Sequence, residues 1–425
     1  MMNRNLIILT MIILLGPLTM SFADVPEYST PGNGSSLILA DLAVAAPDVV
    51  SSSGGGYWIN GLLTISASDT LTISAGTQVV MNMPVFHDGG YSPPPQDAFL
   101  KIEGKILAQG ADENPVHFKV KYREEINMPW MGLWHQSTEE ASIYENCLFE
   151  GGGMAIVTDN AMVTITGCEF DQQSVCAVLC TNESTPEITN NTFTGVGRGT
   201  GIALMRCTSS TVVENNNLTG FDAGIFVHGN HTEGGGALAQ TGGLTITDTT
   251  VTGAGCQGLA ADSADVTVSN SFFQQCCDGL FAFGDSILSL IGSSFEDNDN
   301  AGVLAGEESN TTLNSCILTG NGQGDTGWGY ETGGGLLLIG NASSDLDGGR
   351  NSLFETSGMN LVNFTPNNVQ AEQNYWGGDL PEAESTIWDG NDPDILSQVG
   401  FTPGSTTYDA NWEPSQSGLE SALWS

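Results

Sequence analysis

A pair of apolar residues five positions apart recurs along the chain, and no other feature limits the possible folds as strongly. The copies are Tyr144 and Phe149, Ile165 and Phe170, Ile188 and Phe193, Val213 and Leu218, Ile246 and Val251, Val268 and Phe273, Leu290 and Phe295, and Leu313 and Leu318. The second member of the pair returns after 21, 23, 25, 33, 22, 22 and 23 residues, and a further apolar run follows each pair. A period this short cannot bury its own apolar face, but stacked copies can, so the pattern predicts a solenoid.

The residues inside the repeat indicate which kind of solenoid forms. Asn, Thr and Gly are poor helix formers, and no apolar stripe of helical spacing accompanies them, which excludes helical repeats. The spacing of leucine-rich repeats is absent as well. We therefore predict an all-β fold, a parallel β-helix of roughly ten or more coils spaced about 4.8 Å apart.

The third residue after the first apolar position is a thiol, a hydroxyl or an amide in every copy. These residues are Cys147, Cys168, Asn191, Asn216, Thr249, Ser271, Ser293 and Cys316. We expect this position to turn the chain between two sheets, and its side chain to bond to the next coil as a structural ladder. A ligand role for Asn191 is the alternative.

Both ends of the repeat region carry motifs of a known family. The segments LTISAGTQVVM (71–81), LKIEGKILAQGADENPVHF (100–118), MGLW (131–134) and NYWGG (374–378) resemble those of secreted right-handed β-helix proteins of the pectin-lyase-like class. This resemblance implies a right-handed coil. It implies no particular reaction, because the family includes lyases, hydrolases, epimerases, adhesins and surface proteins.

The N-terminus has the features of a secretion signal. Arg4 precedes an apolar run from Leu6 to Leu18, and Ser21-Phe22-Ala23 is a small-x-Ala cleavage site. No second apolar run of spanning length follows, so we expect a secreted or cell-surface protein without a transmembrane span after cleavage. The expected organisation is a signal peptide at 1–23, a flexible segment at 24–56, a β-helix at 57–403 and a tail at 404–425. Within the β-helix we expect N-terminal coils at 57–134, main repeats at 135–378 and a closing segment at 379–403.

The chain is strongly acidic, which restricts its partners. It contains 49 Asp and Glu against 9 Lys and Arg, for a formal net charge of −40. Nucleic acid is excluded because binding it requires many cationic side chains. Polyanionic sugars would be repelled unless metal ions bridged them. The expected partners are therefore neutral glycans or cell-surface components.

The second apolar run of each repeat also provides a candidate binding face. Alternate residues of a strand point to opposite sides, so placing Ile225, Leu259, Leu280 and Val303 inward places other side chains outward. The candidate ligand-binding residues are Phe226, His228, Asp262, Phe281 and Phe283 on these strands, and Asp325, Trp328 and Tyr330 in a loop at 320–335. Aromatic rings beside polar groups can stack on sugars, although a loop or the tail can instead cover such rings. A second insertion spans residues 229–243.

Catalytic and metal-binding patterns are incomplete. Residues 227–231 approach the Gly-His-Gly of polygalacturonase-type hydrolases but lack the accompanying Asp-Asp pair. We expect no cofactor. Calcium at the acidic stretches 296–299 or 389–394 is the alternative, but neither stretch fits the spaced ligands of a calcium loop. Cys147 and Cys168 stand at equivalent positions of adjacent coils, where stacked buried thiols are preferred to a disulfide.

These observations together predict a secreted or cell-surface β-helix protein that serves as a non-enzymatic scaffold for binding or adhesion. A polysaccharide lyase or glycoside hydrolase acting on the outward face is one alternative. A structural component of a surface layer is another.

Overall fold

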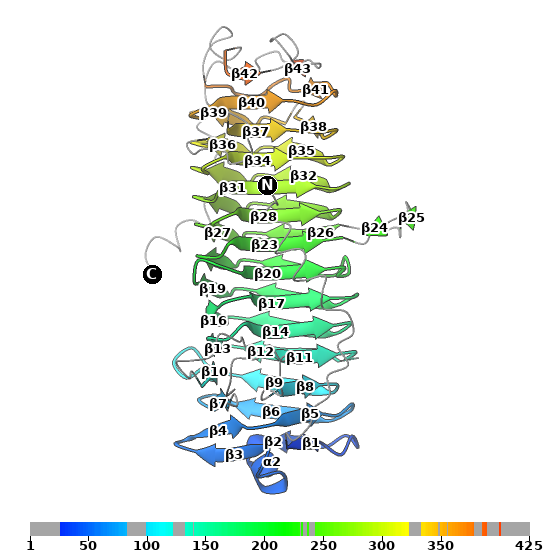
Figure 1. Cartoon of the computed structure of the whole chain (residues 1–425), viewed down its shortest axis with the longest axis vertical. Helices are drawn as coiled ribbons and strands as arrows, with labels where there is room; N and C mark the ends of the chain where they lie inside the picture. The colour runs from blue at the N-terminus through cyan, green and yellow to red at the C-terminus, as the bar shows by residue number, and fades with distance from the viewer. Residues whose placement is uncertain are drawn as a thin grey trace, which may run out of the picture.

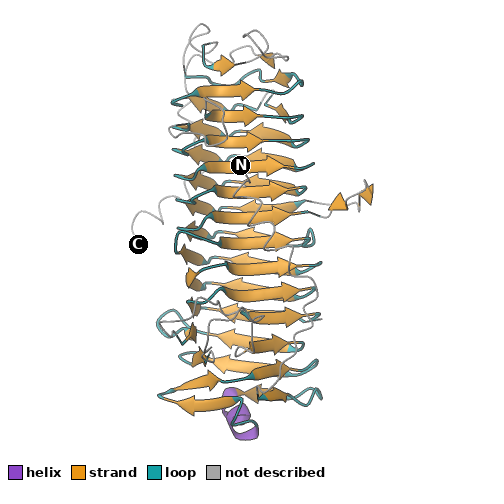
Figure 2. Ribbon diagram, viewed as in Figure 1, coloured by secondary structure: helices purple, strands orange, loops and turns teal. Residues whose placement is uncertain are grey.

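The computed structural model describes residues 26–82, 99–121, 132–138, 140–229, 231–232, 236–237, 243–322, 333–346, 349–354, 356–377, 385–388 and 399–400. Each turn of the chain adds one strand to each of three long sheets, here called A, B and C, which together form a rod (Figures 1 and 2). The predicted β-helix is therefore confirmed. The expected signal peptide at 1–23 and the tail at 404–425 lie outside the described residues.

The strands of each sheet follow one another along the rod. Sheet A contains β1 (Glu27–Ser29), β5 (Leu62–Ile65), β8 (Phe99–Ile102), β11 (Leu133–Gln136), β14 (Met154–Asp159), β17 (Cys176–Thr181), β20 (Thr200–Met205), β23 (Ala223–His228), β28 (Gln257–Asp262), β31 (Asp278–Phe283), β34 (Ala301–Ala305), β37 (Gly334–Leu338), β40 (Met359–Asn363) and β42 (Ile387–Trp388). Sheet B contains β2 (Ser36–Ile38), β6 (Thr70–Ser74), β9 (Lys105–Gln109), β12 (Ser142–Glu145), β15 (Met162–Thr166), β18 (Thr185–Thr189), β21 (Val212–Glu214), β26 (Leu244–Thr247), β29 (Asp265–Ser269), β32 (Ile287–Ile291), β35 (Asn310–Asn314), β38 (Ser343–Asp345), β41 (Val369–Gln370) and β43 (Val399–Gly400). Sheet C contains β3 (Val50–Ser53), β4 (Gly56–Ile59), β7 (Gln78–Met81), β10 (Val116–Val120), β13 (Cys147–Glu150), β16 (Glu169–Gln173), β19 (Thr192–Gly195), β22 (Asn217–Thr219), β27 (Thr250–Thr252), β30 (Phe272–Gln274), β33 (Ser294–Glu296), β36 (Ile317–Thr319) and β39 (Ser352–Phe354).

The recurring apolar pair spans two of these sheets. Ile188 lies on β18 of sheet B and Phe193 on β19 of sheet C, and both are fully buried. Ile188 is in register with the first members of the neighbouring pairs, and Phe193 with the second members. The further apolar run of each repeat forms sheet A, so each coil contains three strands. The apolar columns meet in one continuous core along the rod.

Aromatic rings form part of that core. The rings of Phe118, Phe149, Phe170 and Phe193 lie nearly parallel, with centroids 5.0, 4.7 and 4.5 Å apart in turn. Offset stacking of this kind adds to the free energy gained from burial. The stack follows from register, because the same position of each coil holds Phe.

The bend between sheets B and C differs in one detail from expectation. The eight residues at the ladder position are all buried. The left-handed backbone, however, belongs to the residue before each of them. These preceding residues have φ between 49° and 61° and are Asn146, Gly167, Asn190, Asn215, Asp248, Asn270, Gly292 and Ser315. The residue before the ladder therefore turns the chain, and Gly, Asn and Asp adopt this conformation most readily.

The ladder side chains accept hydrogen bonds from the preceding coil, whereas the sequence analysis expected them to bond to the next coil. Asn191 Oδ1 accepts from the Cys168 N–H at 2.8 Å, and Asn216 Oδ1 accepts from the Asn191 N–H at 3.1 Å. The Thr249, Ser271 and Ser293 hydroxyls accept from the corresponding backbone N–H groups, at 3.4, 3.2 and 3.2 Å. Each bond satisfies a backbone donor that the bend removes from the sheets.

The N-terminal residues correct one prediction. Residues 26–56 are not a flexible segment, because they form β1, β2, helix α2 (Leu39–Ala45) and β3. Helix α2 lies at the N-terminal end of the rod (Figure 1), and its Leu39 and Leu42 are buried in the core. The Asp69 carboxylate accepts hydrogen bonds from the N–H groups of Gly32, Asn33 and Ser35, and these bonds fix the turn between β1 and β2. A solenoid exposes its core at its end, and this segment covers it.

Candidate functional site

The predicted strand residues lie on the outer face of sheet A, in two adjacent columns. One column places Phe226 of β23 beside Ala260 of β28 and Phe281 of β31. The other places His228, Asp262 and Phe283 on the same three strands. The sheet register therefore brings all five predicted strand residues into one region.

His228 and Asp262 form a hydrogen-bonded pair. Nδ1 of His228 is 2.9 Å from Oδ2 of Asp262, and the two side chains are 32% and 13% exposed. The Ser263 hydroxyl donates to Oδ1 of the same carboxylate at 3.1 Å. Asp262 thus orients the imidazole ring on a face that solvent can reach.

The aromatic side chains are less accessible than stacking on a sugar ring would require. Phe226 is only 9% exposed and belongs to an apolar cluster with Leu179, Ala203 and Ala260. Its ring lies parallel to that of His228, with centroids 6.5 Å apart. Phe281 and Phe283 are half-buried, with ring centroids 4.9 Å apart. A column of fully exposed rings is therefore not present, and Phe283 offers more ring surface than Phe226.

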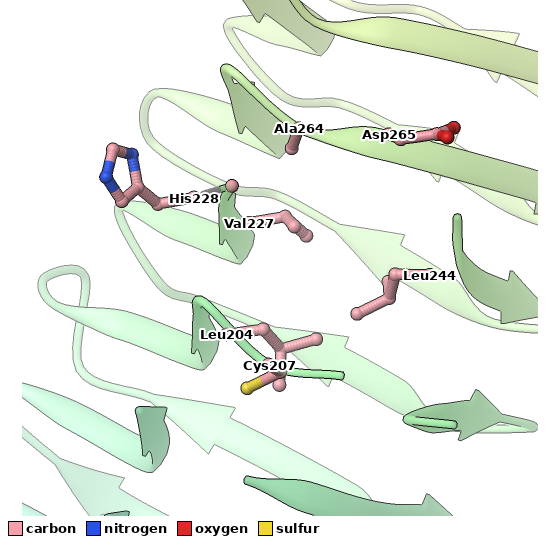
Figure 3. Close-up of a pocket in the computed structure, with 8 residues that line it drawn as sticks. Leu204, Cys207, Val227, His228, Leu244, Ala264 and Asp265 are labelled. Carbon is pink, nitrogen blue, oxygen red and sulfur yellow. The ribbon is translucent and has the colours of Figure 1, made fainter. Parts of the chain in front are cut away.

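The cavity beside His228 is too small for a sugar. It has a volume of about 10 Å³ and is lined by Leu204, Cys207, Val227, His228, Gly229, Leu244, Ala264 and Asp265. This volume holds roughly one water molecule. Figure 3 shows the His228 ring pointing away from the side chains of Leu204, Cys207, Val227 and Leu244. A ligand of His228 would therefore bind at the outer surface.

The two predicted insertions lie partly outside the described residues. Asp325, Trp328 and Tyr330 belong to the stretch 323–332, which is not described. In the other insertion, β24 (His231–Thr232) and β25 (Gly236–Ala237) pair antiparallel and extend sideways from the rod (Figure 1).

The metal and cysteine predictions concern other parts of the rod. Among the described residues, no group of three or more His, Cys, Asp or Glu side chains is arranged to hold a metal ion. The acidic stretch at 389–394 is outside the described residues.

All nine cysteines are described and none forms a disulfide. Cys147 and Cys168 are stacked and buried, and the Cys147 N–H donates to the Cys168 sulfur at 3.4 Å.

Sequence reasoning missed a second ladder and an apolar row. At the bend between sheets C and A, the Cys276 N–H donates to Asn298 Oδ1 at 3.0 Å, and the Asn298 N–H donates to Asn321 Oδ1 at 3.1 Å. On the outer face of sheet A, Leu304, Leu337 and Val362 are at most 1% exposed. The signal was available in the runs 301–305 and 334–338, because strands without polar side chains are buried on both faces.

The comparison with known proteins identifies the family. The pattern described as "Right handed beta helix region" matches residues 131–237 and 230–374. The chain belongs to the right-handed beta helix family. Among curated proteins, none matches the chain.

Solved structures similar to this beta helix chain include a periplasmic alginate epimerase, AlgG. It has 11% sequence identity and a TM-score of 0.48, and the match covers 86% of this chain and 83% of that one. A substitution mutant of the same epimerase has 14% identity and a TM-score of 0.46, with the same coverage.

No helix among the described residues is long and apolar enough to cross a membrane.

Proposed function

We propose that this beta helix protein is a secreted or cell-surface scaffold. It binds neutral glycans on the outer face of sheet A and does not catalyse a reaction on them. The observation that carries the proposal is the His228–Asp262 hydrogen bond directly beside Phe283. A sugar ring has an apolar face of C–H groups and a rim of hydroxyls. The Phe283 ring can contact the first, and the imidazole and carboxylate can exchange hydrogen bonds with the second.

Charge favours a neutral ligand over an anionic one. The net charge of −40 creates a negative potential around the rod, which repels polyanions. Strands β23, β28 and β31 themselves carry no Lys or Arg. A neutral polysaccharide meets no such repulsion.

The carboxylates on the strands of sheet A lie too far from one another to form a glycosidase pair among themselves. On strands β11 to β40 of this sheet, the carboxylates are Asp159, Asp262 and Asp278. Asp159 is four strand spacings from Asp262, about 19 Å. Asp278 is fully buried and is displaced from Asp262 by five positions along the strand, roughly 16 Å. Glycosidases need two carboxyl groups at about 5 to 10 Å.

One observation supports an enzyme as the second candidate. An imidazole oriented by a carboxylate, as His228 is by Asp262, is also the arrangement of a general base. A polysaccharide lyase acting on this face would use His228 to remove a proton. Release of unsaturated or reducing ends from polysaccharides would establish this alternative.

The test is a glycan array of neutral polysaccharides, followed by titration of the best ligand. We expect His228→Ala and Phe283→Ala each to weaken binding at least tenfold, and the wild-type protein to leave the polysaccharide chain intact. Ile287→Ala is the control, because Ile287 is 57% exposed on the outer face of sheet B. Unchanged affinity in both sheet A variants would exclude this face as the binding site.

A further inference from the structure

A buried acid and a buried amide contact each other between two neighbouring coils. Asp278 is the first residue of β31 and is fully buried, and Asn300, just before β34, is 1% exposed. Nδ2 of Asn300 donates to Oδ1 of Asp278 at 2.5 Å. The backbone register places Asp278 opposite Gln257 of β28 and Ala301 of β34. The pair therefore links two successive coils at the edge of sheet A.

Each partner of this pair has one polar atom that bonds to nothing. Asp278 Oδ2 and Asn300 Oδ1 are both buried, and neither has a hydrogen-bond partner in the part of the chain that the structure describes. Both are acceptors when the acid is ionised, so they cannot satisfy each other. Native structures leave few buried polar atoms in this state.

One proton resolves both deficits. A carboxylic acid offers one acceptor and one O–H donor, and a primary amide offers one donor and one acceptor. With a proton on Oδ2, Asp278 can donate to Asn300 Oδ1 while Asn300 Nδ2 donates to Asp278 Oδ1. The existing hydrogen bond already holds the two groups together, so only the proton is missing.

The surroundings favour the neutral acid. The titratable groups that face Asp278 from the neighbouring turns are Cys256, Cys276, Cys277 and Asp299. None of them is cationic. Burial raises the pKa of Asp278 to about 7, and the hydrogen bond from Asn300 opposes this rise. Burial also raises the pKa of the Cys276 and Cys277 thiols to about 11 and about 12, so they stay neutral around pH 7.

We propose that Asp278 and Asn300 form a binding site for one proton, and that this proton holds the coils of β31 and β34 together. Loss of the proton leaves a buried charge on Asp278 and two unsatisfied acceptors, its own Oδ2 and Asn300 Oδ1, so the two coils open more readily. The rod is therefore most firmly closed at acidic pH at this point. Because β31 also carries Phe281 and Phe283, the proton stabilises the strand beneath the candidate binding face.

The test is hydrogen exchange by mass spectrometry from pH 5 to pH 9, with each peptide normalised to its intrinsic exchange rate. In the wild-type protein we expect the opening constant of peptides from β31 and β34 to rise with pH up to the carboxyl pKa and then to level off. With the pKa raised from 3.8 to about 7, the rise between pH 5 and pH 7 is roughly a hundredfold. In Asp278→Asn, the new amide supplies a permanent donor, so this rise should disappear. Asp299→Asn is the matched control: it removes an exposed neighbouring charge and should keep the rise.

Two results would overturn the proposal. One is the same pH dependence in Asp278→Asn as in the wild type, which an ionised acid with a bridging water would produce. The other is a loss of protection on adding EDTA to the wild type but not to Asp278→Asn, which would mean that a cation occupies the site. Infrared spectra of the wild type with ¹³C-labelled Asp provide a check that needs no variant. A protonated carboxyl band should persist at pH 6, and its absence there would also overturn the proposal.

Discussion

Asn216 Oδ1 accepts two hydrogen bonds from Asn191, one from the backbone N–H at 3.1 Å and one from Nδ2 at 3.0 Å. Asn216 in turn donates from Nδ2 to the Ile188 carbonyl at 2.8 Å. Two amides at the same position of successive coils thus satisfy each other and the backbone at the bend. The same arrangement returns at Asn351 and Asn374 near the far end of the rod.

Asn216→Ala should destabilise the protein by about 2 to 4 kcal/mol, because it removes these bonds and leaves buried donors and acceptors unsatisfied. Thermal and urea unfolding will measure the loss. Asn217→Ala is the control, since Asn217 is exposed on the adjacent strand and its replacement should change stability by about 0.5 kcal/mol or less. Equal effects of the two substitutions would contradict a stabilising role for the amide ladder.

Phe170→Ala should cost about 3 to 5 kcal/mol. Phe170 is fully buried between the rings of Phe149 and Phe193, at 4.7 and 4.5 Å, so its removal leaves a cavity and interrupts the stack. Glu169→Ala alters the exposed neighbour on the same strand and serves as the comparison in chemical unfolding. A loss below about 1 kcal/mol for Phe170→Ala would mean that the core closes around the missing ring.

His135 should make the folded protein less stable in acid. It is fully buried, its Nε2 is 2.8 Å from the Tyr144 hydroxyl, and burial lowers the pKa of His135 to about 3. Above pH 6.5 the side chain is neutral in both the folded and the unfolded chain, so it contributes no pH dependence. As pH falls from 6.5 towards 3, only the unfolded chain gains the proton, and stability falls by about 1.4 kcal/mol per pH unit.

Urea unfolding of the wild type and His135→Gln at pH 7.5 and pH 4.5 checks this expectation. The variant should lose less stability than the wild type over this interval. His117→Gln replaces a half-buried histidine that contacts Glu150 at 2.8 Å, and it provides the control for histidine removal in general. Parallel behaviour of His135→Gln and the wild type would show that His135 does not cause the acid sensitivity.

Asp262→Ala should weaken glycan binding by roughly tenfold through His228, because the imidazole loses the partner that orients it. Isothermal titration with the ligand found on the array measures the change. Thr267→Ala, on the outer face of sheet B, is the control. If Asp262→Ala binds as tightly as the wild type, the carboxylate does not position His228 for the ligand.

The repeat pattern allowed the fold to be predicted because each coil meets copies of itself. Ile188 and Phe193 had to stack on their equivalents, since a coil of this length has no other apolar surface to pack against. The candidate face was predicted from alternation along a strand, which correctly grouped His228 with Asp262 and Phe283. Alternation could not show that Phe226 is nearly covered, because exposure depends on neighbours in several coils.

The sequence by itself therefore determined the coil, its apolar columns and the polar residue at each bend, because these depend on local alternation repeated at a nearly constant period. The tertiary structure alone decided the rest. Helix α2 covers the end of the core although the sequence before residue 57 shows no repeat. Asp278 meets Asn300, and His135 meets Tyr144, without any pattern in the sequence to pair them. The physical reason is that burial and partners are set by the packing of strands in three dimensions. His135 meets a residue from another sheet of its own coil, and Asp278 meets a residue one full turn away.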